Sequence, residues 1–495
     1  MSDIVELINK TKVYDVAVET PLDYAPELSK LLKAKVYLKR EDLQSIHSFK
    51  LRGAYNKIVN LTEVEKSAGI MAASAGNHAQ GVALSAQKLR IRATIVMPRT
   101  TPDIKVAAVR ELGADVILQS DSFTDASIFA MQLAENNGMT YIHPFDDELV
   151  IAGQGTIAKE IYEQLSTVDY VFIPIGGGGL ISGIAAYLKS VNPEIKVIGV
   201  EPEDSNAMAQ SIKQNKQIEL DNVGIFADGV AVKKVGDLTL KLTKKYVDEI
   251  VTVTTDEISV AIKDIYSETR SIVEPAGALG VAGLKKYRFI KDLTGKNLVA
   301  INSGANMTFE RLQFIAERTL VGSLREVLYA IELPEHPGAL NDLVKKVING
   351  FSITEFNYRK QSETRAQIFV GVLLELPSDK TGFERNLKNT GYKHVDLTED
   401  EIAKSHLRHM VGGKPPVGTK EIIFEFTFPE RPGALGDFLD AMNNEHNISL
   451  FHYRYTGGDI ARVLIGLEGS EVDNFELPKG FSRELISSKA IELFL

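Results

Sequence analysis

Between residues 35 and 305, short runs of apolar and β-branched residues alternate with longer segments whose apolar positions have helical spacing. This alternation is typical of α/β layering around a mostly parallel sheet. It predicts strands at residues 36–39, 69–73, 93–97, 115–118, 140–143, 170–175, 196–200 and 298–301. Ligands of open α/β sheets bind beyond the carboxyl ends of strands, so the loops after these strands are candidate site segments.

The last third of the chain contains an internal repeat. The tetrapeptide Pro-Gly-Ala-Leu at 337–340 recurs at 432–435, and residues 353–359 recur as 448–454, both at an offset of 95 residues. Each copy reads as strand, turn, helix, strand and strand, the opening of a ferredoxin-like unit. The expected elements are strands 327–333 and 422–428, helices 339–348 and 434–442, strands 353–359 and 448–454, and strands 367–374 and 462–467.

The Pro-Gly turn of each copy has two interpretations. It can bring backbone amides close to a small ligand at the helix start, or it can simply begin the helix. Between the copies, residues 412–418 are rich in glycine and proline and are expected to be a linker.

Composition narrows the classes of function. The 495 residues exceed what one core usually organises, and 56 basic against 66 acidic residues give a net charge of −10. That charge argues against nucleic acid or an anionic membrane as the main partner and favours a small metabolite. The chain has no cysteine, which excludes disulfides and thiolate metal sites, and no histidine pair has metal-site spacing, so we expect no metal. Without a signal segment or a membrane-length apolar run, a cytoplasmic protein is expected.

Lys50 follows the predicted strand 36–39 and begins a helical pattern. The positive end of a helix dipole disfavours an extra positive charge, which helps to depress the pKa of a nucleophilic amine. Most lysines of soluble proteins are solvated, and from this segment alone that alternative stays open.

A glycine-rich loop joins the predicted strand 170–175 to the next helical pattern and consists of Gly176, Gly177, Gly178, Gly179 and Leu180. Successive amides at a helix start can bind one anion, so the loop is a candidate phosphate site. No Gly-Lys-Ser/Thr follows, which argues against a nucleotide P-loop. A dinucleotide site that uses Glu201 and a purely structural tight turn are the alternatives.

Two further strand ends carry polar groups. The loop after strand 69–73, formed by Ser74, Ala75, Gly76 and Asn77, can hold a carboxylate through its amides, and the Asn77 side chain can bond a phenolic oxygen. Alternatively, Asn77 and His78 cap the following helix. Ser303, after strand 298–301, can meet a ring nitrogen or can be a buried hydroxyl satisfied by the backbone.

A lysine, a phosphate site, an amide and a hydroxyl together suit pyridoxal 5′-phosphate. Residues 48–54, 74–81, 176–180 and 302–306 resemble the fold-type II pyridoxal phosphate enzymes, in particular the threonine ammonia-lyases. The repeat copies resemble the ACT-like regulatory subdomains of the biosynthetic members. The resemblance implies a catalytic domain over residues 1–320, with two doubly wound α/β subdomains, and α+β ACT-like subdomains over 325–410 and 420–495.

The resemblance also implies roles for the candidate residues. Lys50 would be the Schiff-base lysine with Phe49 beside the ring, Asn77 would meet the ring hydroxyl, and Ser303 would face the ring nitrogen. Residues 176–180 would bind phosphate, and residues 74–77 would receive the substrate carboxylate. Some racemase relatives have serine at the second position of that loop; Ala75 therefore disfavours racemisation.

The implied activity is conversion of L-threonine to 2-oxobutanoate and ammonia, the first step of isoleucine biosynthesis. Isoleucine would inhibit and valine would oppose it at the C-terminal region of a homotetramer. Two alternative classes of function stay open. One is a serine-preferring or β-replacement enzyme, and the other is a non-catalytic amino-acid sensor.

Overall fold

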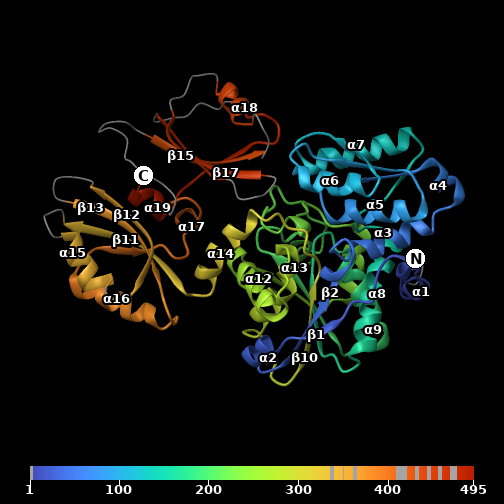
Figure 1. Ribbon diagram of the computed structural model, residues 1–495, viewed down its shortest axis with the longest axis horizontal. Coiled ribbons are helices and arrows are strands. Elements are labelled where there is room, and N and C mark those ends of the chain that lie inside the picture. The colour runs from blue at the N-terminus through green and yellow to red at the C-terminus, as the bar shows by residue number, and fades with distance from the viewer. Residues whose placement is uncertain are drawn as a thin grey trace. The chain divides into compact units, whose positions relative to one another are not determined.

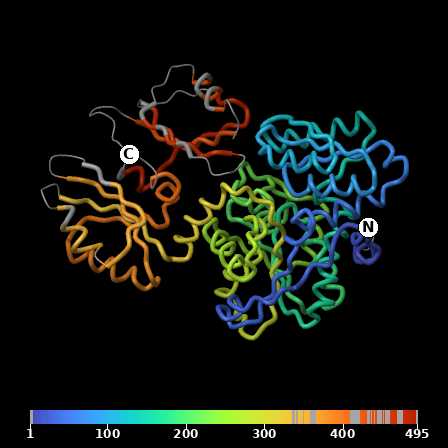
Figure 2. The backbone as a smooth tube through the Cα atoms, viewed as in Figure 1, coloured from blue at the N-terminus to red at the C-terminus, as the bar shows by residue number. Residues whose placement is uncertain are grey.

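The computed structural model describes residues 4–334, 339–348, 350–360, 365–407, 421–429, 434–442, 448–454, 460–468 and 476–494. The chain divides into two compact units, Met1–Phe309 and Glu310–Leu495. The first unit, blue to yellow in Figure 1, layers helices against mostly parallel strands, and the second, traced to its red end in Figure 2, contains two antiparallel sheets.

The larger sheet of the first unit has six strands in the order β1-β2-β10-β7-β8-β9. Strand β1 is antiparallel to β2, and the other neighbours are parallel. The strands are β1 (Leu22–Tyr24), β2 (Lys35–Arg40), β7 (Tyr170–Pro174), β8 (Lys196–Pro202), β9 (Glu249–Val253) and β10 (Asn297–Asn302). The central strands are almost wholly buried, as expected when helices cover both faces of a parallel sheet.

The smaller sheet has four parallel strands in the order β5-β4-β3-β6. They are β3 (Ile70–Ala73), β4 (Ala93–Met97), β5 (Asp115–Leu118) and β6 (Thr140–Tyr141). All eight strands predicted for this part of the chain are confirmed, with ends shifted by at most two residues. Strands β1 and β9 were not predicted, because β1 is very short and β9 is an edge strand with polar residues between its apolar ones.

Helices connect and cover these strands. They are α1 (Ile4–Asn9), α2 (Pro26–Leu32), α3 (Lys50–Val59), α4 (Glu63–Ala68), α5 (Asn77–Leu89), α6 (Asp103–Glu111), α7 (Phe123–Asn136), α8 (Glu148–Gln164), α9 (Gly179–Val191), α10 (Ala207–Lys213), α11 (Asp237–Tyr246), α12 (Thr255–Thr269) and α13 (Pro275–Tyr287). Short 3-10 turns lie at Val13–Asp15, Glu41–Leu43 and Asp228–Val230. Several of the α-helices begin at a residue whose side chain accepts hydrogen bonds from first-turn amides. For example, Asp147 accepts from the first-turn amides of α8.

Glycines let the backbones of helices α3, α8 and α9 approach each other closely. A Cβ atom added to Gly153 of α8 would lie 2.5 Å from the Arg52 carbonyl oxygen of α3. A Cβ atom added to Gly183 of α9 would lie 2.4 Å from the Ile151 carbonyl oxygen of α8. Such approaches exclude any side chain, so these glycines fix where the start of α3 lies relative to the rest of the unit.

The second unit contains two copies of one ferredoxin-like fold. The first sheet has the order β12-β13-β11-β14 and the second the order β16-β17-β15-β18, all antiparallel. The strands are β11 (Glu326–Pro334), β12 (Ser352–Lys360), β13 (Arg365–Leu373), β14 (His394–Asp396), β15 (Glu421–Pro429), β16 (Ile448–Arg454), β17 (Ile460–Glu468) and β18 (Ser482–Leu485). Each βαββ opening predicted from the repeat is confirmed.

The helices of this unit are α14 (Arg311–Gly322), α15 (Ala339–Leu343) with a following π turn (Val344–Ile348), α16 (Asp379–Thr390), α17 (Glu401–Ser405), α18 (Ala434–Ala441) and α19 (Lys489–Phe494). The predicted helix 339–348 therefore changes its hydrogen-bond pattern midway. The Pro-Gly turns at 335–338 and 430–433 and the predicted linker 412–418 lie outside the described residues.

The two repeat copies share the same shift of strand register in their sheets. Strand register shifts between Ile353 and Glu355 in the first copy and between Ile448 and Leu450 in the second, which are the same positions at the repeat offset. The copies also share a buried apolar cluster, with Leu328 and Phe369 from the first and Leu464 from the second. The two copies thus form one packed unit.

The close helix approach gives a testable prediction. Gly153→Ala should destabilise the protein by about 2–4 kcal/mol, because its methyl group has no space beside the α3 backbone. The measurement is thermal unfolding by calorimetry. Gly382→Ala in α16 is the matched control, since nothing lies within 4 Å of its added Cβ. Equal melting temperatures for Gly153→Ala and the unchanged protein would contradict the packing described.

Candidate active site

The loops after four strands of the first unit meet at one place. Ser48 forms an isolated bridge with Gly304, and the Phe49 amide donates to the Ser303 carbonyl oxygen at 3.2 Å. These contacts join the segment after β2 to the end of β10, the neighbouring parallel strand. Asn77, after β3, accepts a hydrogen bond from Asn306, and the loop after β7 lies against Phe145, whose neighbour Pro144 accepts from Lys50. The segments singled out from the sequence are therefore brought together.

Lys50 is the first residue of α3 and is half-buried. Its Nζ donates to the carbonyl oxygen of Pro144 at 3.0 Å and lies 5.4 Å from the centre of the Phe49 ring. Burial lowers the pKa of the Lys50 amine to about 8, although the negative charge of Glu274 opposes the shift. A substantial fraction of this amine is therefore neutral near physiological pH, as nucleophilic and proton-transfer chemistry requires.

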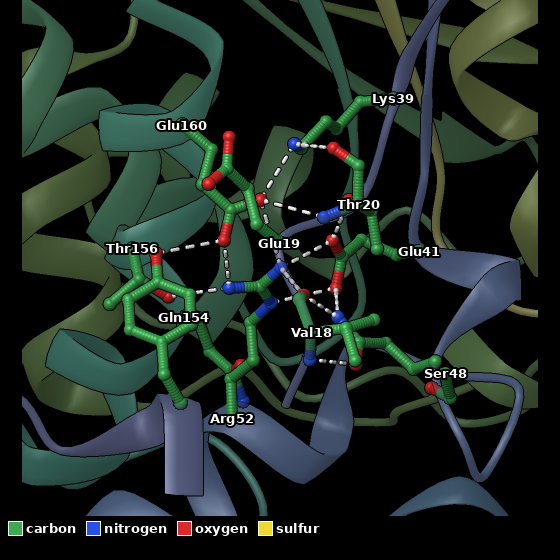
Figure 3. Close-up of polar contacts among 12 residues, drawn as sticks. Val18, Glu19, Thr20, Lys39, Glu41, Ser48, Arg52, Gln154, Thr156 and Glu160 are labelled. Carbon is green, nitrogen blue, oxygen red and sulfur yellow. Dashed lines mark hydrogen bonds and ion pairs between the residues drawn. The ribbon is translucent and has the colours of Figure 1, made fainter. Parts of the chain in front are cut away.

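A buried cluster of charges anchors the first turn of α3 (Figure 3). Arg52 donates to both oxygens of Glu41 at 2.8 Å and to both oxygens of Glu160, and Lys39 pairs with Glu160 at 2.6 Å. These four side chains are at most 1% exposed. Burial alone would raise the pKa of Glu160, but Arg52 and Lys39 hold it below its ordinary value. Two positive and two negative charges compensate one another.

The glycine loop is more constrained than a tight turn requires. Gly178 caps α9 with φ of 94°, a left-handed conformation that favours glycine. An added Cβ at Gly177 would lie 2.2 Å from the Phe145 ring, and one at Gly178 would lie 2.6 Å from Met208. The Thr239 hydroxyl also donates to the Gly177 carbonyl oxygen at 2.6 Å. The first-turn amides of α9, from Gly179 and Leu180 onward, have no partner within the helix and suit a phosphate.

The loop after β3 starts α5. The Ser74 hydroxyl accepts from the Gly76 amide at 3.2 Å, and Gly76 is the N-cap, with open space around its α-carbon. Asn77 donates through Nδ2 to Glu274 at 2.7 Å and accepts through Oδ1 from Asn306 at 2.7 Å. Ala75 and its neighbours in this loop are half-buried, so the loop is accessible to a small ligand.

The capping alternative for Asn77 and His78 is wrong, because no side chain caps α5. His78 is buried, and its Nε2 donates to the Ile142 carbonyl oxygen at 2.9 Å. Burial lowers the pKa of His78 to about 3, so its ring is neutral. His78 therefore joins α5 to the segment after β6.

Ser303 is 3% exposed and follows the end of β10. Its hydroxyl donates to the Ala276 carbonyl oxygen in the first turn of α13 at 3.4 Å. The predicted backbone-satisfied hydroxyl is therefore confirmed, and the contact of Ser303 with a ring nitrogen stays a prediction. A weak backbone bond of this length leaves the hydroxyl able to turn toward a ligand.

Glu201 does not serve a dinucleotide site. Its carboxylate accepts from the Met208 and Ala209 amides at 2.9 and 2.8 Å, in the first turn of α10. Burial raises the pKa of Glu201 to about 8. Because both carboxylate oxygens already accept from backbone amides, Glu201 is not placed to bind a ribose hydroxyl. The dinucleotide alternative therefore loses its support.

Several residues of the site were not singled out from the sequence. Phe145 fills the space above Gly177, and Asp146 accepts from three amides at the start of α11, one of them from Thr239 at 3.1 Å. Glu274 bonds Asn77 from the N-cap of α13. Their contacts join residues that are far apart in the sequence. The only local indication was the position of Glu274 directly before a proline at a helix start.

The arrangement can hold a small phosphate-bearing aldehyde. The glycine loop leads into the first-turn amides of α9, Lys50 is an amine of lowered pKa, and Asn77 and Ser303 carry a donor amide and a hydroxyl. In the described part of the chain, no group of three or more histidine and acidic residues could hold a metal ion, and no helix is long and apolar enough to cross a membrane.

Comparison with known proteins gives two family matches. Residues 13–304 match the pyridoxal-phosphate dependent enzymes, and residues 317–407 and 414–485 match the C-terminal regulatory domain of threonine dehydratase.

Relatives match over nearly the whole chain. A biosynthetic L-threonine dehydratase of Burkholderia multivorans is 49% identical over 481 residues, covering 96% of this chain and 95% of that protein. The corresponding Pasteurella multocida protein is 47% identical, covering 95% and 92%. The structure of processed threonine deaminase isoform 2 from Solanum lycopersicum, 49% identical, covers 64% of this chain and 92% of its own, with a TM-score of 0.63. The chain therefore belongs to the biosynthetic threonine dehydratases, a family of pyridoxal-phosphate dependent enzymes with a C-terminal regulatory domain.

Proposed function

We propose that Lys50 and the strand-end loops around it form the active site of this threonine dehydratase. The enzyme converts L-threonine to 2-oxobutanoate and ammonia, in the biosynthesis of isoleucine. The convergence of Lys50, the glycine loop, Asn77 and Ser303 is the observation that supports the site assignment, because each serves a different part of one cofactor. The catalytic domain is proposed to span residues 1–320.

Pyridoxal 5′-phosphate is held in this proposal by groups of the chain that suit its parts. Gly176, Gly177, Gly178, Gly179 and Leu180 bind the phosphate through amides at the start of α9. Phe49 packs beside the ring, Asn77 donates to the ring hydroxyl, and Ser303 faces the ring nitrogen. When bound, the cofactor supplies an aldehyde for the Lys50 amine and an electron-withdrawing ring.

Lys50 then acts as the base. Its amine, whose pKa burial lowers to about 8, takes the proton from the α-carbon of threonine. The Pro144 carbonyl oxygen, which accepts from Nζ at 3.0 Å, orients the amine before this transfer. Loss of the β-hydroxyl as water and hydrolysis of the resulting enamine give 2-oxobutanoate and ammonia.

Substrate orientation is assigned to the loop after β3. Amides of Ser74, Ala75, Gly76 and Asn77 receive the substrate carboxylate, for which the open space at Gly76 leaves room. Ala75 has no hydroxyl to return a proton to the opposite face of the α-carbon, which favours elimination over racemisation. Ser303 carries a neutral hydroxyl in place of a carboxylate, so it does not hold the ring nitrogen protonated, and this favours elimination over transamination.

Lys50→Ala tests the site. It should remove the visible absorbance of the lysine-bound cofactor and lower turnover of threonine by roughly a thousandfold or more, because both base and covalent anchor are lost. The measurements are the absorbance spectrum and 2-oxobutanoate formation, with serine and added thiols as competing substrates. Lys88→Ala, an exposed lysine of α5, is the control. Near-normal ammonia release by Lys50→Ala would refute the assignment.

We also propose that isoleucine binds the C-terminal unit and lowers activity, and that valine opposes it. The ACT-like subdomains are proposed to span 325–410 and 420–495, within a homotetramer of the cytoplasm. Because the unit contains two copies of one fold, it offers two equivalent binding positions for related amino acids. Each effector changes activity by binding two states of the enzyme with different affinity.

A chain that ends at Gly322, the last residue of α14, tests the regulatory proposal. It should convert threonine without response to isoleucine, whereas the full chain is inhibited and valine relieves the inhibition. The measurement is the rate of 2-oxobutanoate formation over an isoleucine titration, with leucine as the control ligand. Undiminished isoleucine inhibition of the shortened chain would contradict the proposal.

A further inference from the structure

Glu274 is a buried carboxylate in contact with the proposed cofactor site. It is the N-cap residue of α13 and is 4% exposed, and its own amide donates to the Gly304 carbonyl oxygen at 3.2 Å. A side chain at this position often bonds the first-turn amides of its helix. The Glu274 side chain does not do so; its Oε1 accepts from Asn77 Nδ2 at 2.7 Å. The carboxylate therefore serves α5 and not its own helix.

The contacts of Asn77 fix which way its amide points. A carboxylate only accepts hydrogen bonds, so the Asn77 nitrogen must face Glu274. On the other side, Asn306 donates through Nδ2 to Asn77 Oδ1 and to the Ile46 carbonyl oxygen, each at 2.7 Å. Glu274 uses one of the two N–H bonds of Asn77, and the second can point at another acceptor.

Two glycines leave space for the Glu274 carboxylate. An added Cβ at Gly304 would lie 2.6 Å from Oε1 of Glu274, and one at Gly229 would lie 3.4 Å from the same oxygen. Larger residues at Gly304 would displace the carboxylate. Burial of a charge is unfavourable unless partners compensate it, and the Asn77 amide is one such partner of Glu274.

The charge of Glu274 acts on Lys50. Ionisable groups that interact with the Lys50 amine include Glu274, His78 and His143. Burial lowers the pKa of both histidines, which keeps them neutral. Glu274 also lies against the segment that leads to Lys50, since a Cβ atom added to Gly304 would lie 2.6 Å from Glu274 Oε1 and 3.2 Å from the His47 carbonyl oxygen. Glu274 therefore supplies a negative charge that opposes the effect of burial on the lysine.

We propose that Glu274 is a positioning residue that turns the Asn77 amide nitrogen toward the ring hydroxyl of the cofactor and stabilises a positive charge on the Lys50 nitrogen. The proposal rests on the assignment of Lys50 and Asn77 as cofactor ligands. Its two parts are separable, because glutamine keeps an oxygen that accepts from Asn77 but carries no charge, whereas alanine provides neither.

The test is a pH titration of the visible absorbance of the full-length holoenzyme, together with cofactor affinity. A negative charge favours the protonated nitrogen, so removing it in Glu274→Gln should lower the titration midpoint by about one pH unit. Cofactor affinity should stay within about threefold in Glu274→Gln and fall by about tenfold in Glu274→Ala, which loses the hydrogen bond to Asn77. Glu203→Gln removes an exposed charge from the same unit and should leave both quantities unchanged.

An unchanged midpoint in Glu274→Gln would overturn the electrostatic part of the proposal, even if the melting temperature falls. Equal cofactor affinity in Glu274→Ala and the unchanged enzyme would overturn the positioning part. If Glu274→Ala does not fold, the spectrum of Glu274→Gln still decides the electrostatic part. A tenfold loss of cofactor affinity in Glu274→Gln, which keeps an acceptor for Asn77, would then overturn the positioning part. A visible band that survives in Lys50→Ala would instead refute the assignment of Lys50 itself.

Discussion

The compensated charges around Arg52 are the constraint on which the active-site geometry depends. Arg52 and Lys39 face Glu41 and Glu160 in a fully buried cluster that joins the end of β2, the start of α3 and the C-terminal part of α8 (Figure 3). Such pairs add little net stability, but losing one partner leaves an uncompensated buried charge, which is strongly destabilising. Arg52 lies two positions after Lys50, so the cluster fixes the helix turn that carries the lysine.

A second constraint is the segment between β6 and α8. Pro144 accepts from the Lys50 amine, Phe145 closes the space over Gly177, and Asp146 holds the start of α11, whose Thr239 bonds the glycine loop. Three adjacent residues thus link the amine to the proposed phosphate cradle. The Pro144 carbonyl oxygen, the Phe145 ring and the Asp146 carboxylate therefore help to set the spacing between these two parts of the cofactor site.

Sequence patterns predicted the strands of the first unit because buried parallel strands are continuous apolar runs. They predicted strands of the second unit because each element recurs at the same offset in the other repeat copy. They also located Lys50, Asn77, Ser303 and the glycine loop, since each lies in a segment between a strand and the next element. Their roles toward the cofactor stay predictions. Glu274 and Phe145 were missed because their contacts with Asn77 and Gly177 depend on tertiary packing. The capping role for His78 was wrong because burial directs its ring to a backbone carbonyl on another segment.

The most direct measurement is the location of the covalently bound cofactor. Borohydride reduction of the holoenzyme fixes the cofactor to its lysine, and mass spectrometry of tryptic peptides then identifies the modified residue. We predict the modification on Lys50, within a peptide that runs from Glu41 to Arg52 because the modified lysine is not cleaved. Modification of another lysine, such as the buried Lys39 nearby, would contradict the account.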